Sequence, residues 1–248
     1  MRSTLLCCNL LLFSCFSHAQ EKELVFSYWS EASPPFIFLN DRQDGVPEKG
    51  IIKDLGLLIA QRLNLVPRFI NLPVQRIEQK LRSGELDIDC ITNPIWKELP
   101  NELNWSPALF GGADRFLVKR SKKASIRKLE DLKGKSLGVY NGYVYHADLM
   151  RMIDGGAINV VKVSDIDHGI KLLLLERIDA LIDFDVLLNY KIQHGYSDSL
   201  ALADLYADRY DLHCAYSKKM SINRVAVDEA LLDIISSGQL EDILNRYQ

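Results

Sequence analysis

The sequence has few cysteines and no block of positive charge. Three of its five cysteines lie within the N-terminal apolar stretch, so only Cys90 and Cys214 remain in the rest of the chain. Two cysteines cannot build the multi-disulfide framework of small secreted domains. Thirty Lys and Arg face thirty-three Asp and Glu, a net charge of -3. Without a basic block to neutralise a phosphate backbone, we expect no nucleic-acid partner.

Motifs of enzymes and metal sites are missing as well. The sequence has no Gly-x-Ser-x-Gly turn, no Walker loop and no pair of histidines at metal-ligand spacing. His146, His168, His194 and His213 each stand alone, which is typical of surface or hydrogen-bonded structural histidines. We therefore predict neither catalysis nor a cofactor nor a metal ion.

Long hydrophobic runs are scarce, and the one that stands out lies at the N-terminus. Arg2 precedes an apolar run from Leu5 to Phe16, and small residues follow at Ser17 and Ala19. This pattern predicts a secretory signal at residues 1–19, and the run is too short for a membrane-spanning helix. A lipoprotein signal ending at Cys15 is the alternative, but the bulky Phe13 disfavours it. About 229 residues would then work outside the cytoplasm.

The remaining chain has the composition of an ordinary globular protein, with 48% hydrophobic and 25% charged residues. Strand-like and helix-like segments alternate almost to the C-terminus, which predicts an α/β fold with mainly parallel sheets. We expect strands at 24–29, 68–71, 86–92, 116–119, 136–140, 160–163, 180–184 and 213–216. Apolar residues at helical spacing predict helices around 52–63, 74–81, 225–235 and 240–247.

Six short segments carry a resemblance that covers the whole mature chain. They are Ser33-Pro34-Pro35-Phe36, Gly50 to Leu55, Leu81 to Asp87, Trp105-Ser106-Pro107, Leu129 to Lys135 followed by Ser136 to Val139, and Arg177 to Ala180. In this order and spacing the chain resembles the family 3 extracellular solute-binding proteins, which are type II periplasmic binding proteins of bacteria. Each segment alone is a weak signal, and the assignment depends on their common order.

The resemblance implies an α/β fold of two lobes, each with a mixed sheet and flanking helices, joined by two hinge strands. Lobe 1 would hold residues 20–112 and 212–248, and lobe 2 would hold residues 113–211, with the hinge near 114–118 and 211–214. Closure of such lobes buries a small polar ligand from water. We expect a periplasmic monomer that serves an ABC permease or a membrane sensor.

The resemblance also sets the expectations for Cys90 and Cys214. If the strand at 213–216 returns beside the third strand, the two cysteines lie on adjacent strands and can approach bridging distance. Buried cysteine is common as a small hydrophobic residue, so we favour two free thiols. A single disulfide stays open as the alternative.

One departure from the family concerns the ligand. Amino-acid-binding members use an Arg after the third strand to hold the ligand's α-carboxylate, and the matching position here is Leu99. A simple α-amino acid is therefore not the expected ligand. Lys97 could supply positive charge from a neighbouring position, although a solvated surface lysine is the more common role.

Eight residues are the candidate ligand-binding residues. Arg76, in an element that resembles a Pro-x-x-Arg of relatives, would bind an anionic ligand group, unless it is an ordinary surface Arg. The turn at Gly142 would present backbone N–H groups at a helix N-terminus. A lobe 2 carboxylate is expected where Phe184 stands, so Asp183 serves only if the register shifts by one. The candidates are Phe36, Arg76, Thr92, Trp96, Gly142, Tyr143, Tyr145 and Asp183.

Two other functions remain open from the sequence. A few relatives on this fold are dehydratases of prephenate-like or arogenate-like substrates, and such chemistry needs an acid/base pair with shifted pKa values in the cleft. Only Glu31, Lys97, Asp183 and Asp185 stand at suitable positions. The other alternative is an accessory protein whose lobe surface binds a membrane receptor.

Overall fold

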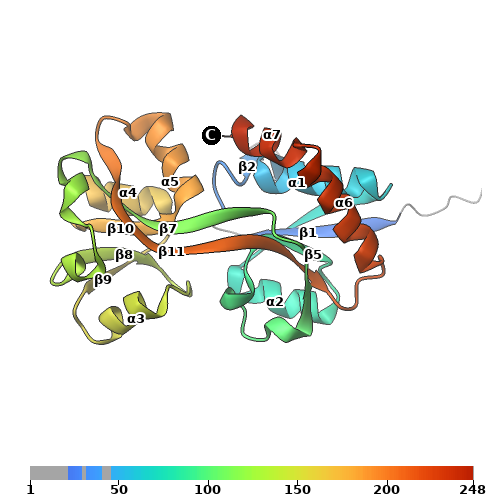
Figure 1. Ribbon diagram of the computed structural model, residues 1–248, viewed down its shortest axis with the longest axis horizontal. Coiled ribbons are helices and arrows are strands. Elements are labelled where there is room, and N and C mark those ends of the chain that lie inside the picture. Colours follow the sequence, from blue (N-terminus) through green and yellow to red (C-terminus); the bar gives the residue numbers. More distant parts are fainter. Residues whose placement is uncertain (1–21, 30–31, 41–45, 248) are drawn as a thin grey trace, which may run out of the picture.

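The structure is a computed structural model that describes residues 22–29, 32–40 and 46–247. The predicted signal peptide and Glu31 lie outside the described residues. The described chain forms two lobes that lie side by side along the long axis, joined by two long strands (Figure 1). This arrangement agrees with the fold class predicted from the sequence.

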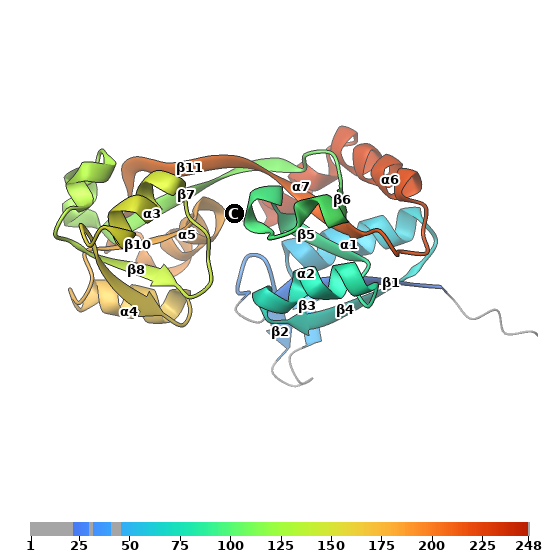
Figure 2. The same ribbon diagram turned by 90° about the horizontal axis from the view of Figure 1, so that it is seen from below.

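Lobe 1, as we use the term, consists of the elements before β7 and the two C-terminal helices. Its central strands are β4, β1 and β5, with β1 parallel to both neighbours. The strands are β1 (Glu23–Trp29), β2 (Phe38–Asn40), β3 (Val46–Lys49), β4 (Val66–Leu72), β5 (Ile88–Thr92) and β6 (Leu103–Trp105). The helices are α1 (Ile51–Arg62), α2 (Val74–Ser83), α6 (Arg224–Ser236) and α7 (Gln239–Arg246). Figure 2 shows α2 on one side of the lobe and α6 on another.

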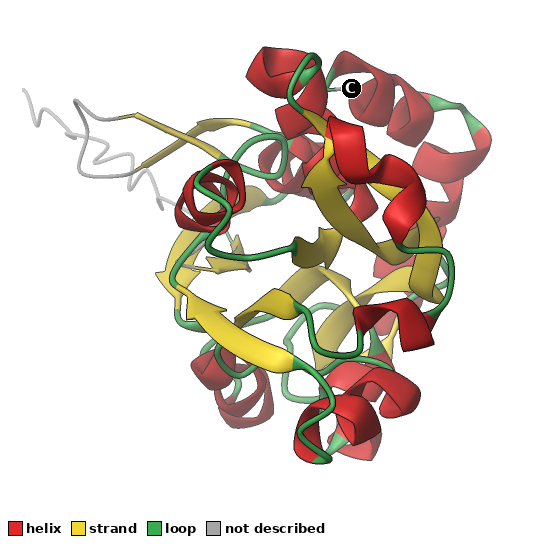
Figure 3. Ribbon diagram, turned by 90° about the vertical axis from the view of Figure 1, so that its left-hand side faces the viewer, coloured by secondary structure: helices red, strands yellow, loops and turns green. Residues whose placement is uncertain are grey.

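Lobe 2 contains the middle of the chain. Its strands β8 (Ser136–Tyr140), β9 (Asn159–Val163) and β10 (Ala180–Phe184) pair in parallel, with β8 in the middle. Helices α3 (Ala147–Asp154), α4 (Ile166–Leu174) and α5 (Asp185–Lys191) cover this sheet. Seen from the lobe 2 end in Figure 3, strands occupy the middle and helices the outside of the molecule. This layering lets each helix bury one apolar stripe against a sheet.

Two long antiparallel strands, β7 (Phe110–Lys119) and β11 (Leu200–Ser217), run between the lobes. Beyond Leu212, β11 pairs with β5 and β6 of lobe 1, and from Asp114 onward β7 pairs with β10 of lobe 2. The segment that belongs to neither sheet alone is therefore Phe110–Ala113 together with its partners on β11. The predicted hinge at 114–118 begins just past this segment, within the lobe 2 sheet. The predicted lobe boundaries fall within these paired strands and stay a prediction.

The lobes contact each other through aromatic side chains. The ring of Phe36 from lobe 1 stacks on Phe184 from lobe 2 with centroids 5.5 Å apart, and Phe38 meets Tyr190 edge-on at 6.0 Å. As a result, the largest buried apolar cluster extends through both lobes. Two smaller clusters, one in each lobe, lie away from this contact. Two lobes suggest two wholly separate cores, but here one apolar cluster continues from one lobe into the other.

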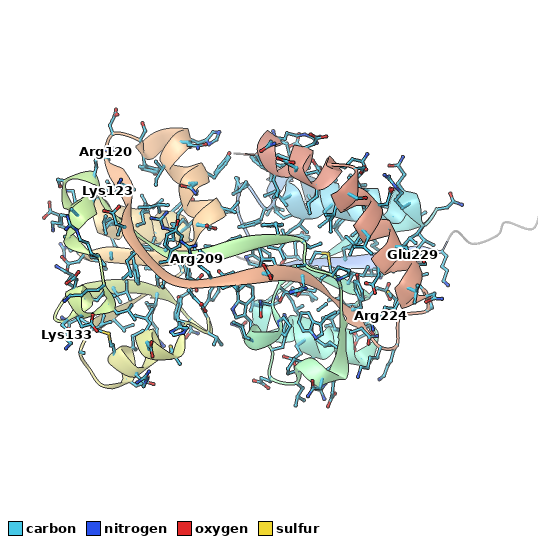
Figure 4. The ribbon with its side chains drawn as sticks, in the orientation of Figure 1. Arg120, Lys123, Lys133, Arg209, Arg224 and Glu229 are labelled. Carbon is cyan, nitrogen blue, oxygen red and sulfur yellow. A yellow bond between two sulfur atoms is a disulfide. The ribbon has the colours of Figure 1, made fainter. Side chains whose placement is uncertain are left out.

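The expectation of two free thiols is wrong. Cys214 on β11 lies opposite Cys90 on β5, and their Sγ atoms form a disulfide of 1.97 Å. Figure 4 draws this bond in yellow, among the strands within lobe 1. The expectation of two thiols rested on the frequent burial of cysteine as a small hydrophobic residue. The antiparallel pairing of β11 with β5 instead places the two side chains directly opposite each other. The bond thereby fastens a crossing strand to the lobe 1 sheet.

Candidate functional site

A cavity of about 600 Å³ lies between the lobes. Lobe 1 contributes the first turns of α2, the end of β5 and the short helix Pro94–Trp96 that follows it. Lobe 2 contributes the turn after β8 and the end of β10, and the crossing strands contribute Asp114, Tyr210 and Leu212. A volume of this size suits a small molecule enclosed by both lobes.

Seven of the eight candidate residues line this cavity. The structure brings together Phe36, Thr92, Trp96, Gly142, Tyr143, Tyr145 and Asp183. Arg76 is exposed on α2 and is not among the lining residues, so the structure does not bring it to the cavity. Its neighbours Gln75, Glu78 and Gln79 line the cavity instead. The helix was placed correctly by its apolar spacing, but its rotation turns Arg76 away.

The turn at Gly142 differs from the expectation. Helix α3 begins at Ala147, so Gly142 lies well before the helix and its N–H group is not at a helix N-terminus. Gly142 instead has a φ of 78°, and a Cβ there would come within 2.8 Å of the Gln75 side chain from lobe 1. Glycine therefore permits a close approach of the two lobes at this edge of the cavity.

Lys97 is not the solvated surface lysine that its residue type suggests. Its side chain is only 9% exposed and its Nζ lies 3.2 Å from Oδ2 of Asp89, which is also buried. The Ser27 hydroxyl donates to the other oxygen of Asp89 at 2.8 Å. The charge of Lys97 is therefore neutralised by Asp89 within the protein. Leu99, by contrast, is 41% exposed and is not among the residues that line the cavity.

Of the two carboxylates that flank Phe184, Asp183 is the one that lines the cavity. Both Asp183 and Phe184 line the cavity at the end of β10, whereas Asp185 begins α5 and does not. The Tyr140 hydroxyl donates to Oδ2 of Asp183 at 2.5 Å, and the Phe184 N–H donates to Oδ1 at 2.7 Å. Burial raises the pKa of Asp183 to about 7, although these hydrogen bonds act to lower it.

Asp114, on the adjacent strand β7, is a second carboxyl group in the same cavity. Its Oδ1 accepts a hydrogen bond of 2.6 Å from the Tyr210 hydroxyl. Burial, and to a smaller extent the charges of Asp208 and Asp185, raise the pKa of Asp114 to about 6 against the lowering effect of that bond. The negative charge of Asp114 in turn raises the pKa of Asp183. The cavity thus holds two interacting carboxyl groups that gain protons close to neutral pH.

Sequence reasoning missed several residues of the site. Asp114 was expected only as part of the hinge, and Tyr140 only as the end of a strand. Tyr210 lies in a segment of β11 for which no strand was expected. Asp114 stands two residues before the buried run Phe116 to Val118, and this was a usable signal, since a carboxylate is rarely buried unless it is paired.

No group of three or more His, Cys, Asp or Glu side chains able to hold a metal ion occurs in the described residues. Over the same residues, none of the helices combines the length and the apolar character needed to cross a membrane.

Residues 28–248 match the family described as bacterial extracellular solute-binding proteins, family 3. The chain belongs to this family. The match covers nearly all of the described residues, in agreement with the resemblance of the six segments. A search of curated proteins finds no match.

Solved structures with a similar fold span almost the whole chain. A substrate-binding protein of an amino acid ABC transporter from Streptococcus pneumoniae, bound to L-arginine, superposes with a TM-score of 0.74 at 20% identity, covering 91% of this chain and 94% of that chain. The GluR0 ligand-binding core with L-glutamate gives 0.77 at 15% identity, with 93% and 99% covered. An ancestral arginine-binding protein gives 0.74 at 22% identity, with 91% and 97% covered. At these identities the likeness shows the fold.

Two adjacent glycines on β7 provide a matched test of how tightly the cavity residue Phe184 is packed. A Cβ at Gly112 would lie 2.2 Å from the Phe184 ring, whereas a Cβ at Gly111 would meet nothing within 4 Å. We expect Gly112→Ala to displace Phe184 and to lower the free energy of unfolding by about 1–3 kcal/mol, as overpacking does. Gly111→Ala should stay within about 0.5 kcal/mol of the unchanged protein. Urea denaturation of both variants measures this difference, and equal stabilities would contradict the expectation.

Proposed function

We propose that this protein captures a small polar solute between its lobes in the periplasm and presents it to an ABC permease or a membrane sensor. The observation that carries the proposal is the cavity of about 600 Å³, whose lining combines residues from both lobes and from the crossing strands. A cavity built in this way changes shape when the lobes move, so a ligand that contacts both lobes stabilises the closed arrangement. The family assignment supports the same role.

A thermal-shift screen of the mature protein tests this proposal. The compounds are amino acids, peptides, organic acids, polyamines and sugars. A ligand at one hundred times its Kd adds about 2.7 kcal/mol to the free energy of unfolding, which raises Tm by roughly 5–10 °C for a chain of this length. If no class of small solute raises Tm, the proposed capture of a solute is wrong.

We further propose that simple α-amino acids bind poorly. Leu99 stands where the family resemblance expects an Arg, and the two cations that line the cavity are already paired, Lys97 with Asp89 and Arg82 with Glu102. A free α-carboxylate would therefore lack a charge-assisted partner worth about 1.5–3 kcal/mol per hydrogen bond. The similar structures described with L-arginine and L-glutamate make an amino acid the direct alternative.

Calorimetry with glutamine, histidine, arginine and glutamate decides between these alternatives. We expect dissociation constants weaker than about 1 mM, which corresponds to about 4 kcal/mol of binding free energy. Micromolar binding of any of the four would contradict this part of the proposal and leave the solute-binding role intact.

Catalysis is a second candidate because of one specific observation. Asp183 and Asp114 are carboxyl groups in the cavity with pKa values raised to about 7 and about 6, as an acid/base pair requires. We would then expect turnover of a prephenate-like or arogenate-like substrate. Incubating the protein with prephenate and with arogenate, and following product formation, tests this candidate. Absence of turnover would remove it.

A further inference from the structure

The charged residues that line the cavity are mainly acidic. Five carboxylate side chains stand beside two cations, and most of these charges are already used. Lys97 pairs with Asp89, Arg82 pairs with Glu102 outside the cavity, and Glu78 accepts backbone N–H groups of Glu98 and Leu99. The carboxylates are Glu78, Asp89, Glu98, Asp114 and Asp183, and the cations are Arg82 and Lys97.

Asp114 and Asp183 are the two cavity carboxyl groups that remain available in the interior. Among the described residues, no Lys, Arg or His forms an ion pair with either of them. Their hydrogen-bond donors are the uncharged hydroxyls of Tyr210 and Tyr140 and one backbone N–H group. An isolated buried carboxylate is costly unless an opposite charge approaches it. Charge complementarity at this pair therefore calls for a positive group from outside the protein.

Aromatic rings surround the same space. Phe36 and Phe184 stack across the lobes, and Phe184 lies nearly parallel to Tyr210 at 6.1 Å. Ring faces attract cations and bind flat or apolar bodies, and this attraction strengthens when water is excluded. The aromatic lining residues are Trp29, Phe36, Trp96, Tyr140, Tyr143, Tyr145, Phe184 and Tyr210.

We infer that the solute is an organic cation, with an ammonium group held by the carboxyl groups of Asp114 and Asp183 and a flat or apolar body between the aromatic rings, and without a free carboxylate. This inference rests on the proposed solute-binding function. It replaces the sequence-based expectation of an anionic group bound by Arg76, which the structure leaves outside the cavity.

Binding of a cation between the two carboxyl groups is coupled to the release of protons. Without ligand, both carboxyl groups are partly protonated near neutral pH, because burial raises their pKa values. A cation favours the ionised form, so its binding releases protons and its affinity rises with pH. We expect at least about tenfold weaker binding at pH 5.5 than at pH 8. The other charged and titratable groups around the pair are Tyr140, Tyr145, Asp185, Asp208, Tyr210 and Arg115, with Asp89 and Lys97 lining the lobe 1 side of the cavity. Arg115 lies opposite Asp183 in the β7–β10 pairing, and its Nη2 donates to the carbonyl oxygen of Ala203.

Matched probes separate charge from shape. Phenethylamine and cadaverine are the amines that remain when phenylalanine and lysine lose their carboxylate, and 3-phenylpropionate carries the opposite charge on the same ring and linker as phenethylamine. Calorimetry of these five compounds with the mature protein, beside the general solute screen, gives the ranking. We expect an amine to bind at least about tenfold more tightly than its α-amino acid, and 3-phenylpropionate to bind most weakly.

Variants identify the groups responsible. Asp183→Asn and Asp114→Asn keep the side-chain shape and should each weaken amine binding about 10- to 100-fold. Asp198→Asn, on an exposed turn of lobe 2, is the matched control and should leave binding within twofold. Titration at pH 6.5 in two buffers of different ionisation enthalpy should reveal protons released by the unchanged protein and fewer by Asp183→Asn. Thermal unfolding of each variant confirms that it is folded.

The outcomes are distinct. An α-amino acid, a carboxylate or a neutral solute as the tightest ligand overturns the cation inference but keeps the solute-binding function. Amine binding that survives both Asn substitutions within twofold also overturns it, because the charge would then be held elsewhere. No binding of any small solute overturns the proposed function itself.

Discussion

Replacing Cys90 and Cys214 together by alanine is expected to lower the free energy of unfolding by about 2–5 kcal/mol. The disulfide joins residues 124 positions apart, so it restricts a long loop of the unfolded chain, and it fastens β11 to β5 where a crossing strand enters lobe 1. Urea denaturation of the mature protein and of the variant measures the difference.

Reductant supplies the control for this prediction. Dithiothreitol should destabilise the unchanged protein by a similar amount and leave the double alanine variant unaffected, because only the former has a bond to lose. Titration of the denatured, unreduced mature protein should find no free thiol. Two free thiols, or equal stabilities with and without reductant, would show that the bond is absent.

Asp183→Asn is expected to stabilise the ligand-free protein at pH 8 while it weakens ligand binding. Burial raises the pKa of Asp183 from 3.8 to about 7, so the folded state holds a proton that the unfolded chain releases above about pH 4. The contribution of this group to stability is therefore fully present below about pH 4 and is lost as pH rises to about 7. At about 1.4 kcal/mol per pKa unit, the gain on removing the charge is on the order of 2–4 kcal/mol.

Denaturation at several pH values tests the sign as well as the size of this effect. The difference in stability between Asp183→Asn and the unchanged protein should grow from pH 4 to pH 7 and stay constant above. The exposed Asp198→Asn variant should show no such growth. A difference that shrinks with rising pH would mean that Asp183 is stabilised as a carboxylate in the ligand-free protein.

A binding site that holds a buried, unpaired charge lowers the stability of the ligand-free protein. In lobe 1, Asp89 and Lys97 neutralise each other within 3.2 Å, so this part of the cavity is complete without a ligand. In lobe 2 and at the crossing strands, the donors to Asp183 and Asp114 within the described part of the chain are hydroxyl and backbone groups. This asymmetry is the reason that we assign the charge recognition to the lobe 2 side of the cleft.

The sequence by itself determined the family and the positions of many of the strands and helices. Alternating apolar segments predicted strands that the structure places at β1, β4, β5, β8, β9 and β10, and the spacing around Ile77 and Leu81 predicted α2. These features depend on residues close together in the chain, so a local pattern suffices to reveal them. The six family segments are local in the same sense, and seven of the eight candidate residues chosen from the sequence line the cavity.

Only the tertiary structure decided what those residues do. The rotation of α2 directed Arg76 away from the cavity and Gln75 toward Gly142, and antiparallel pairing of β11 with β5 joined Cys90 to Cys214. Asp114 met Tyr210 from 96 positions away, and Asp183 met Tyr140 from 43 positions away. Such contacts are set by strand register and lobe packing, which no local pattern encodes. The buried carboxyl groups on which the proposed recognition of a cation rests therefore became apparent only in the folded molecule.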